Sequence, residues 1–365
     1  MNPRALLVDE SAKDLKLAGR LEASGLPCLP LLPSPSLDSL LGDIADALGR
    51  GRANIVLLDY RLDEELGPEG GRPNYRGGAV AAAVKERFPT TPIVLVTSQE
   101  KLRHSLEANP RVRDLFDLEV MKRDLNDFRR RPVEAARISD LAAGFEKLAL
   151  AANRARSKDP WVLLGRLLVL SKDEIAIVQR RVAGPLPVEP LDIISWLMDE
   201  LLAYPGPLLA DDEASASLGI TREAFLGSGV QSFASSSLYD GVFSVVHRRW
   251  WRHRLEELLQ GLFGDEAVDP GSRAAKIAGA IDERIGAAEC VWCEGAEVVR
   301  ACQVCKEPVD GSHSVGASMD ERPPWADIAV VCFLCIQTGR ADGIEYLPGS
   351  SDMVARVRSG GVPRR

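Results

Sequence analysis

The stretch Ile55-Val-Leu-Leu-Asp59 places an acid directly after a run of four apolar residues. Three other short apolar runs also end in polar residues, at Asp9-Glu10, at Thr97 and at Lys122. Such runs, separated by helical patterns, predict an α/β fold in which strands alternate with helices in a doubly wound parallel sheet. Because the carboxyl ends of parallel strands meet at one edge, the sequence predicts that these polar side chains gather in one crevice.

Phosphoryl transfer to a carboxylate requires two further acids, a hydroxyl and a lysine around that carboxylate. The sequence contains all of these groups. A carboxylate that attacks a phosphoryl donor brings negative charge onto negative charge. A hard divalent cation on oxygen ligands and a lysine are therefore needed to neutralise it. Mg²⁺ fits this ligand set, and a nearby hydroxyl can reorient once phosphoryl oxygens are present.

Over residues 3–130 the chain resembles the receiver domain of two-component response regulators. The matching segments are Leu6-Leu-Val-Asp-Glu10, Ile55–Asp59, Gly77-Gly78 at the start of a helix, Pro92–Thr97 and Val120-Met-Lys122. The resemblance implies a five-stranded sheet, a phosphoprotein and a histidine kinase as the partner that supplies the phosphoryl group.

Residue by residue, the resemblance makes Asp59 the phospho-acceptor. It implies that Asp9 and Glu10, together with Asp59, hold Mg²⁺. It also makes Thr97 the switch hydroxyl and Lys122 the cation on a phosphoryl oxygen. The alternative is a receiver-like scaffold that is not phosphorylated. A cluster of acids with a lysine favours a functional site over this alternative.

The sequence departs from the receiver pattern beside the acceptor and before the lysine. Residues 60–76 separate Asp59 from Gly77, a longer segment than the family has there. This segment is predicted to act as a lid or a partner surface. Glu119 stands where receivers often have an aromatic residue, and Arg123 follows the lysine where a proline is common. A charge change at Asp59 could therefore be transmitted by the family's usual route or by this segment.

The composition is that of an ordinary soluble globular protein, with 45% apolar and 27% charged residues. The net charge of −8 gives no general attraction to nucleic acid or to anionic lipid. No apolar stretch approaches the roughly 18–20 residues that cross a bilayer, and the start of the chain has no signal-peptide pattern. The sequence therefore predicts a cytoplasmic protein that does not contact membranes.

Six of the seven cysteines form three Cys-x-x-Cys pairs, whose spacing lets both thiolates bind one metal ion. The pairs are Cys290-Val-Trp-Cys293, Cys302-Gln-Val-Cys305 and Cys332-Phe-Leu-Cys335, and Cys28 stands alone. In a reducing compartment such pairs indicate metal thiolates more than disulfides. Tetrahedral zinc takes four ligands, and closed thiolate sites leave no position for water, so the sequence predicts structural Zn²⁺.

The zinc ligands predicted from the spacing are Cys302, Cys305, Cys332 and Cys335, in a zinc-ribbon or treble-clef-like module. Two alternatives stay open for the remaining pair, Cys290 and Cys293. The pair could share a zinc ion with Cys302 and Cys305, or His313 could complete a second site. The simpler interpretation of His313, as a polar loop residue, is favoured.

The predicted organisation has five parts. A receiver-like domain covers residues 1–130, a helical connector 131–158, an all-helical domain 159–288, a zinc-binding module 289–348 and a disordered tail 349–365. The helical domain is inferred from helical patterns that proline and glycine interrupt. The zinc module has little apolar content and is expected to depend on its metal to fold.

Two stretches of the helical domain raise the question of nucleic-acid binding. Residues 214–224 faintly resemble a helix-turn-helix, but glycines and a single cation favour a plain helical hairpin. The stretch His247-Arg-Arg-Trp-Trp-Arg-His-Arg254 could stack bases and hold phosphates. Placed on a helix over Ser237–Phe263, it is better explained by tryptophans in the core and arginines in solvent.

The sequence thus predicts a signal-responsive regulator in a two-component system. It would accept a phosphoryl group and relay it through protein–protein contacts of the helical and zinc regions to an unknown output protein. No enzymatic activity is expected beyond receiver phosphoryl transfer and autodephosphorylation. The alternative is a nucleic-acid-binding regulator that uses the basic and aromatic stretch and the zinc module.

Overall fold

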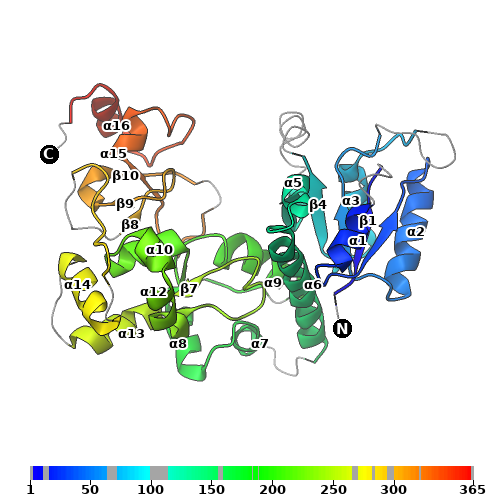
Figure 1. Ribbon diagram of the computed structural model, residues 1–365, viewed down its shortest axis with the longest axis horizontal. Coiled ribbons are helices and arrows are strands. Elements are labelled where there is room, and N and C mark those ends of the chain that lie inside the picture. Colours follow the sequence, from blue (N-terminus) through cyan, green and yellow to red (C-terminus); the bar gives the residue numbers. More distant parts are fainter. Residues whose placement is uncertain are drawn as a thin grey trace. The chain divides into compact units, whose positions relative to one another are not determined.

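The computed structural model describes residues 3–10, 16–63, 72–98, 114–154, 159–182, 184–187, 189–264, 270–281, 284–293, 300–319 and 322–362. The chain packs as two compact units (Figure 1). The first unit is Met1–Lys158 with Glu189–Ile194 and Val242–Val246, and the second unit is the rest of the chain. Among the residues described, no helix has the length and apolar character needed to cross a membrane.

The first unit is built on a five-stranded parallel sheet of order β2-β1-β3-β4-β5. Its strands are β1 (Ala5–Val8), β2 (Cys28–Leu31), β3 (Ile55–Leu58), β4 (Ile93–Thr97) and β5 (Leu118–Met121). Every residue of the three central strands is buried, as a parallel sheet covered on both faces requires. The strand order is that of flavodoxin-like folds, so the predicted doubly wound sheet is confirmed.

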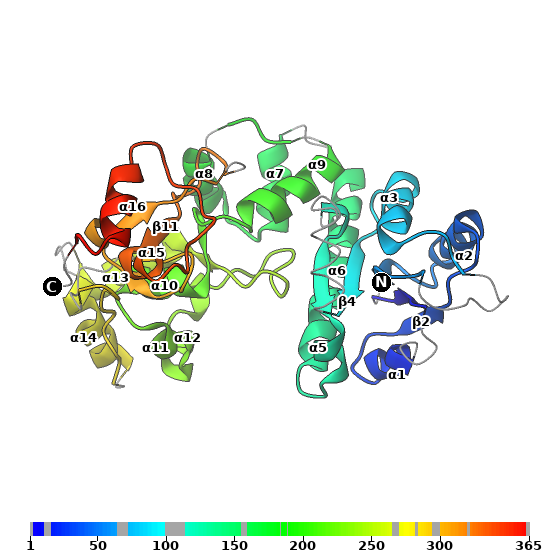
Figure 2. The same cartoon turned by 90° about the horizontal axis from the view of Figure 1, so that it is seen from above.

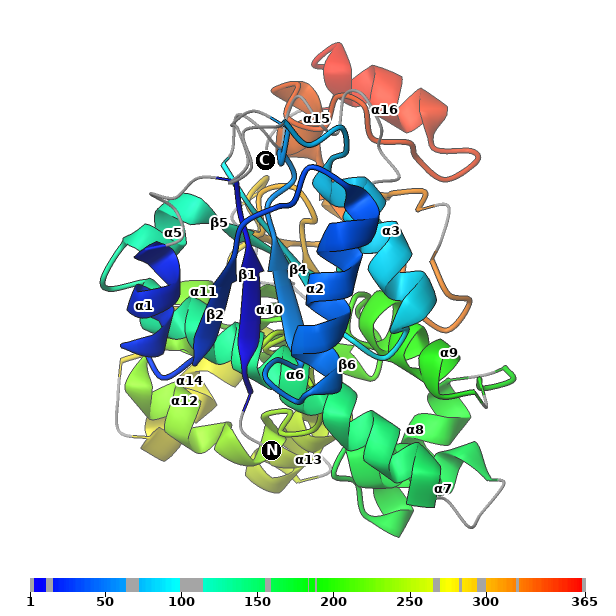
Figure 3. The same ribbon diagram turned by 90° about the vertical axis from the view of Figure 1, so that its right-hand side faces the viewer.

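Two groups of helices cover the two faces of this sheet (Figure 3). The helices are α1 (Lys16–Glu22), α2 (Leu37–Gly49), α3 (Gly77–Arg87), α5 (Lys122–Asn126) and α6 (Arg131–Arg154). α2 contacts α3, whereas α1 contacts α5 and α6. Alternate residues of the central strands, such as Leu6 and Val56, pack in one core with residues of α2 and α3. The helix predicted as a connector, α6, lies within this unit.

The segment Val242–Val246 belongs to the first unit because it docks on α6. Phe243 is fully buried, and its ring meets that of Phe145 edge-on at 5.9 Å. The ring lies so close to Gly144 that a Cβ there would come within 2.2 Å of it. The carboxylate of Asp140 accepts hydrogen bonds of 2.8 and 3.2 Å from two backbone amides of the segment. These contacts fix the segment on the helix.

The second unit begins with a largely helical part. Its elements are α7 (Pro160–Leu167), α8 (Lys172–Arg181), α9 (Pro190–Ser195), η2 (Trp196–Leu201), β6 (Leu208–Leu209), α10 (Asp211–Leu218), α11 (Arg222–Leu226), α12 (Ser228–Phe233), η3 (Ser235–Ser237), β7 (Trp250–Trp251), α13 (Arg252–Phe263) and α14 (Pro270–Ile281). Helix α9 starts in the first unit. The continuous helix predicted over Ser237–Phe263 is wrong in its first half, because β7 pairs there with β6 and the helix begins only at Arg252. Both tryptophans of β7 are buried, one on each side of the strand.

The cysteine-rich part of the second unit combines short strands with two helices. They are β8 (Arg300–Ala301), β9 (Pro308–Val309), η4 (Gly311–His313), β10 (Ser314–Gly316), β11 (Val330–Cys332), α15 (Phe333–Gln337) and α16 (Ser351–Arg358). The prediction that residues 349–365 are disordered is wrong at α16. This helix packs on α15, and its residues Val354 and Val357 are buried in the same core as the cysteines (Figure 2).

Candidate functional site

The acids, the hydroxyl and the lysine singled out in the sequence stand at the carboxyl ends of neighbouring strands. The register between β1 and β3 brings Asp9 alongside Asp59, directly after the two strands end. Thr97 is the last residue of β4, and its partner in β5 is the residue before Lys122. These side chains therefore gather at the carboxyl edge of the sheet, as the strand pattern predicts.

Lys122 joins the two buried acids at this edge. Its Nζ atom lies 2.8 Å from Oδ2 of Asp59 and 2.7 Å from Oδ2 of Asp9. Both acid side chains are 0% exposed and that of the lysine is 13% exposed. Charges removed from water in this way are tolerated only when they are paired. The ammonium group therefore holds two carboxylates close together, which is the charge arrangement that a phosphoryl group or a divalent cation would enter.

Glu10 and Thr97 are also buried at their strand ends, at 6% and 0% exposure. Among the residues described, the carboxylate oxygens of Asp9, Glu10 and Asp59 do not all lie within 4.8 Å of one another. The donor atoms of the two cysteine groups described below do lie this close together. The pair Asp9–Asp59 nevertheless fits Mg²⁺, which is commonly held by one or two carboxylates and keeps several waters. Binding by all three acids stays a prediction.

Gly77 begins α3 in direct contact with the backbone that follows β3. A Cβ atom at this position would lie 2.2 Å from the carbonyl oxygen of Asp59 and 2.9 Å from the Cα atom of Tyr60. The amide of Gly77 donates a 2.8 Å hydrogen bond to the carbonyl of Tyr60. Only glycine permits this approach, so the start of α3 is in direct contact with the backbone of Asp59.

The long segment of residues 60–76 is held at both of its described ends. Asp63 pairs with Arg61 at 3.3 Å and with Arg76 at 3.2 Å, and Tyr75 donates a hydrogen bond to the carbonyl of Ser34. Residues 64–71, which carry most of the predicted lid, lie outside the described residues. A lid or partner surface there stays a prediction.

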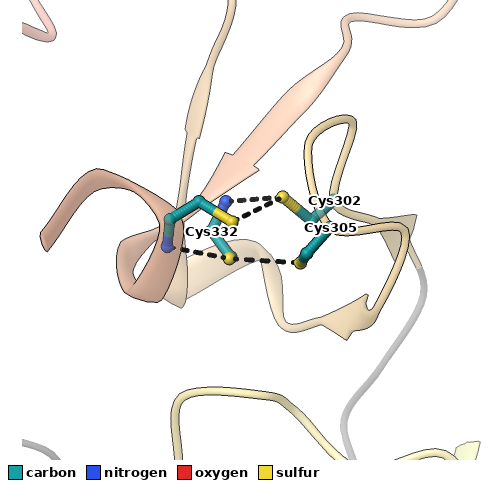
Figure 4. A group of neighbouring side chains, drawn as sticks. Cys302, Cys305 and Cys332 are labelled. Carbon is teal, nitrogen blue, oxygen red and sulfur yellow. Dashed lines mark hydrogen bonds between the residues drawn. The ribbon is translucent and has the colours of Figure 1, made fainter. Parts of the chain in front are cut away.

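The predicted zinc ligands Cys302, Cys305, Cys332 and Cys335 form one cluster, the four-cysteine site (Figure 4). The Sγ atoms of Cys302 and Cys335 are 4.0 Å apart, and those of Cys305 and Cys332 are 3.7 Å apart. Zn–S bonds of about 2.3 Å at the tetrahedral angle give S···S edges of about 3.8 Å. The two spacings match edges of such a tetrahedron, and the four cysteines could therefore hold a metal ion such as zinc.

The local backbone supports these sulfurs. The amide of Cys335 donates to Sγ of Cys332 at 3.4 Å, and the amide of Cys332 donates to Sγ of Cys302 at 3.3 Å. The hydrogen bonds from Cys305 and Cys332 lower the pKa of Cys302, whereas the hydrogen bonds with Cys302 and Cys305 raise the pKa of Cys332. The cluster thus favours the thiolate at Cys302 and the thiol at Cys332, whereas a bound cation would favour the thiolate at both.

A second group of side chains that could hold a metal ion is formed by Cys290, Cys293 and His313, again with donor atoms within 4.8 Å of one another. The alternative in which this cysteine pair shares an ion with Cys302 and Cys305 does not match the clusters that the fold brings together. The interpretation favoured from sequence, that His313 is only a polar loop residue, missed this long-range contact.

The basic and aromatic stretch is part of the core. Trp250 and Trp251 are 1% and 0% exposed, which confirms the expectation of core tryptophans. The arginines around them are neutralised locally: Arg248 pairs with Asp211, Arg252 with Asp327 and Arg254 with Glu174. Buried rings cannot stack on bases, so this stretch does not support the nucleic-acid alternative.

No family model matches the sequence, and no curated protein matches it. Solved structures similar to the chain include a response regulator receiver domain protein from Clostridium thermocellum, with 14% identity and a TM-score of 0.28 over 38% of this chain and 94% of that one. The receiver domain of NtrX from Brucella abortus matches with 21% identity and a TM-score of 0.25 over 36% and 98%. A CheY-like receiver domain protein from Methanospirillum hungatei JF-1 matches with 20% identity and a TM-score of 0.24 over 37% and 98%.

The strand order and the strand-end residues of the first unit carry the assignment of its fold. The order β2-β1-β3-β4-β5 is doubly wound, with the reversal of chain order at β1 and β3. Asp9 and Asp59 end those two strands, and Lys122 contacts both. The N-terminal unit of this chain is a receiver-like α/β domain.

Proposed function

We propose that Asp59 accepts a phosphoryl group in a Mg²⁺-dependent site of the receiver-like domain, so that the chain acts as a signal-responsive regulator. The observation that carries this proposal is the contact of the Lys122 ammonium group with both Asp9 and Asp59 at the carboxyl edge of the sheet. A buried acid, a partner acid and a shared cation are the minimum that phosphoryl transfer to a carboxylate needs.

In the proposed reaction a carboxylate oxygen of Asp59 attacks the phosphorus atom of phosphohistidine on a histidine kinase. The bond from phosphorus to the histidine nitrogen breaks, and its electron pair leaves with the imidazole. Mg²⁺, when bound, neutralises charge on the phosphoryl oxygens. Lys122 moves its ion pair from the Asp59 carboxylate to a phosphoryl oxygen, which leaves Asp9 as a ligand for the cation. The hydroxyl of Thr97 can then donate to the phosphoryl group.

A small phosphodonor tests the first step. Incubation of the purified chain with Mg²⁺ and acetyl phosphate is expected to add one phosphoryl group, measured by intact-protein mass spectrometry. Asp59→Asn removes the nucleophile and should abolish the added mass. Asp46→Asn, which changes a surface acid paired with Arg50 and Arg52, should keep it. If neither the wild type nor Asp46→Asn gains mass, the domain is a non-phosphorylated scaffold and the proposal fails.

We place the relay of this charge change along α3 and α6 within the first unit. Gly77, at the start of α3, contacts the backbone of Asp59. Near the other end of α3, Lys85 lies 5.6 Å from the centre of the Phe145 ring on α6. Phe145 in turn contacts Phe243 of the docked segment Val242–Val246. A shift of α3 would therefore reach a segment that continues into the rest of the chain and towards an output protein.

Hydrogen exchange tests the relay. Phosphorylation is expected to change the exchange rates of the Val245 and Val246 amides, which Asp140 protects in the structure. Lys85→Gln should weaken this response, because it removes the cation over Phe145, whereas Arg87→Gln at the exposed end of α3 should not. An identical response in both variants would show that the signal takes another path, such as the segment of residues 60–76.

The proposal also assigns a structural zinc ion to the four-cysteine site. The support is the match between the sulfur spacings of 4.0 and 3.7 Å and the edges of a zinc tetrahedron. Four thiolates close the coordination sphere, so the ion would hold the short strands and α15 together and take no part in chemistry. The zinc region would then present a surface for protein–protein contacts.

A further inference from the structure

We propose that Cys290, Cys293 and His313 form a second zinc site, separate from the four-cysteine site, in which one coordination position is left to an exchangeable ligand such as water. The donor atoms of these three residues lie within 4.8 Å of one another. The site would use Cys290 and Cys293, the Cys-x-x-Cys pair that is not part of the four-cysteine site.

The geometry suits a zinc ion. Sγ of Cys290 lies 3.8 Å from Nδ1 of His313. Zn–S bonds of about 2.3 Å and Zn–N bonds of about 2.0 Å at the tetrahedral angle give an S···N edge of about 3.5 Å. Cys293 follows at the spacing that lets two thiolates of one turn bind a single ion. Small adjustments of side chains would close the three ligands on a metal.

The backbone around the three ligands is fixed by contacts that need no metal. The amide of Val291 donates to the carbonyl of Pro308 at 3.1 Å, which places the cysteine turn beside β9. The carboxylate of Asp310 accepts a 2.7 Å hydrogen bond from the amide of Ser312 and so shapes the short η4 turn that carries His313. A site assembled before metal binding loses less conformational entropy when the ion arrives.

The second site shares an aromatic core with the four-cysteine site. The ring of Phe333, between Cys332 and Cys335 in the sequence, is met edge-on by Trp292 at 5.6 Å and by His313 at 6.0 Å. These contacts hold the imidazole in position and orient the cysteine turn from the other side. The two sites would therefore stabilise one another through packing, although no ligand is common to both.

The second ion would also join the two parts of the second unit. Ala287, shortly before Cys290, pairs with Ile220 in the turn between α10 and α11. The amide of Ala288 donates to the carbonyl of Gly219 at 2.9 Å. A metal held by the cysteine turn and by His313 would thus fasten a segment anchored in the helical part to the cysteine-rich part.

Three ligands among the described residues distinguish this site from a closed structural one. Zinc bound by three protein ligands keeps a water molecule or a substrate atom in its fourth position. The second ion should therefore leave to a chelator faster than the ion of the four-cysteine site. It should also accept an added donor such as imidazole, which a closed tetrahedron of thiolates cannot.

Metal content and exchange test the site on the full chain. The wild type, purified under reducing conditions, is expected to contain two zinc ions, one lost quickly to a chelator and one slowly. His313→Ala should retain only the slowly lost ion, whereas Cys28→Ser, which changes a cysteine of the first unit, should retain both. His313→Cys replaces one zinc ligand by another and should restore the second ion, which separates ligation from folding.

Cobalt substitution tests the open position. Addition of imidazole should shift the visible absorption bands of the Co²⁺-loaded wild type and leave those of Co²⁺-loaded His313→Ala unchanged. One zinc ion in the wild type, two in His313→Ala, or a Cys290–Cys293 disulfide in the reduced preparation would overturn the proposal. A cobalt spectrum that does not respond to imidazole would overturn the open position.

Discussion

Replacing Cys332 by serine is expected to release the ion of the four-cysteine site and to unfold the cysteine-rich part of the second unit. Its Sγ atom lies 3.7 Å from that of Cys305 and accepts a 3.4 Å hydrogen bond from the amide of Cys335, so it caps α15 and would also be a ligand of the proposed ion. Structural zinc contributes on the order of 10 kcal/mol to the folding of small zinc domains. Zinc content, limited proteolysis and the near-ultraviolet circular dichroism, to which Trp292 contributes, would measure the loss.

The matched control for this prediction is Cys28→Ser in β2, which changes a cysteine that belongs to neither metal-binding group. It should keep the zinc content and the protease resistance of the wild type. Phosphorylation of Asp59 should survive in Cys332→Ser, because the acceptor lies in the other compact unit. Full zinc content and unchanged proteolysis in Cys332→Ser would contradict the assignment of a structural ion.

The carboxyl edge of the sheet could be predicted because its three central strands are short, apolar and buried on both faces. Once the strands are parallel, their carboxyl ends meet at one edge, and the order β2-β1-β3-β4-β5 makes Asp9 and Asp59 neighbours there. The bridging position of Lys122 could not be derived in the same way. It depends on how far a long side chain reaches across two strands, and strand twist and burial decide that together.

The helix predicted around Trp250 and Trp251 is wrong because it places buried side chains on one face only. Two adjacent bulky residues are both buried here because successive side chains of a strand point to opposite faces and this strand is covered on both sides. The neighbouring pair of aromatic residues, which favour strands, was the local signal. The partner strand β6 lies 41 residues earlier in the register Leu209↔Trp250, and such distant pairing cannot be read from a local pattern.

Two further differences have local signals that sequence reasoning passed over. In α16, Val354 and Val357 recur at helical spacing and mark a buried face in a segment otherwise rich in polar residues. Asp310, which accepts a hydrogen bond from the amide of Ser312, is a turn-forming residue that orders the loop of His313. The contact of His313 with Cys290 spans 23 residues and depends on the packing of η4, so only the fold reveals it.

Gly77→Ala is expected to lower the free energy of unfolding of the first unit by about 3 kcal/mol, the upper range for overpacking a close contact. The added Cβ atom would lie 2.2 Å from the carbonyl oxygen of Asp59 and 2.9 Å from the Cα atom of Tyr60. Both are backbone atoms, which cannot rotate away as a side chain can. Urea denaturation measures the loss of stability, and the phosphodonor assay measures the loss of acceptor function.

Gly42→Ala in α2 is the control, because nothing lies within 4 Å of the Cβ position there. A helical glycine replaced by alanine should gain about 0.5–1 kcal/mol, and phosphorylation should be unchanged. The clash at Gly77 can be relieved either by moving α3 or by moving the end of β3. Movement of β3 would carry Asp59 away from Lys122 and slow phosphorylation, whereas movement of α3 alone would spare it. Gly77→Ala with wild-type stability would contradict the close approach itself.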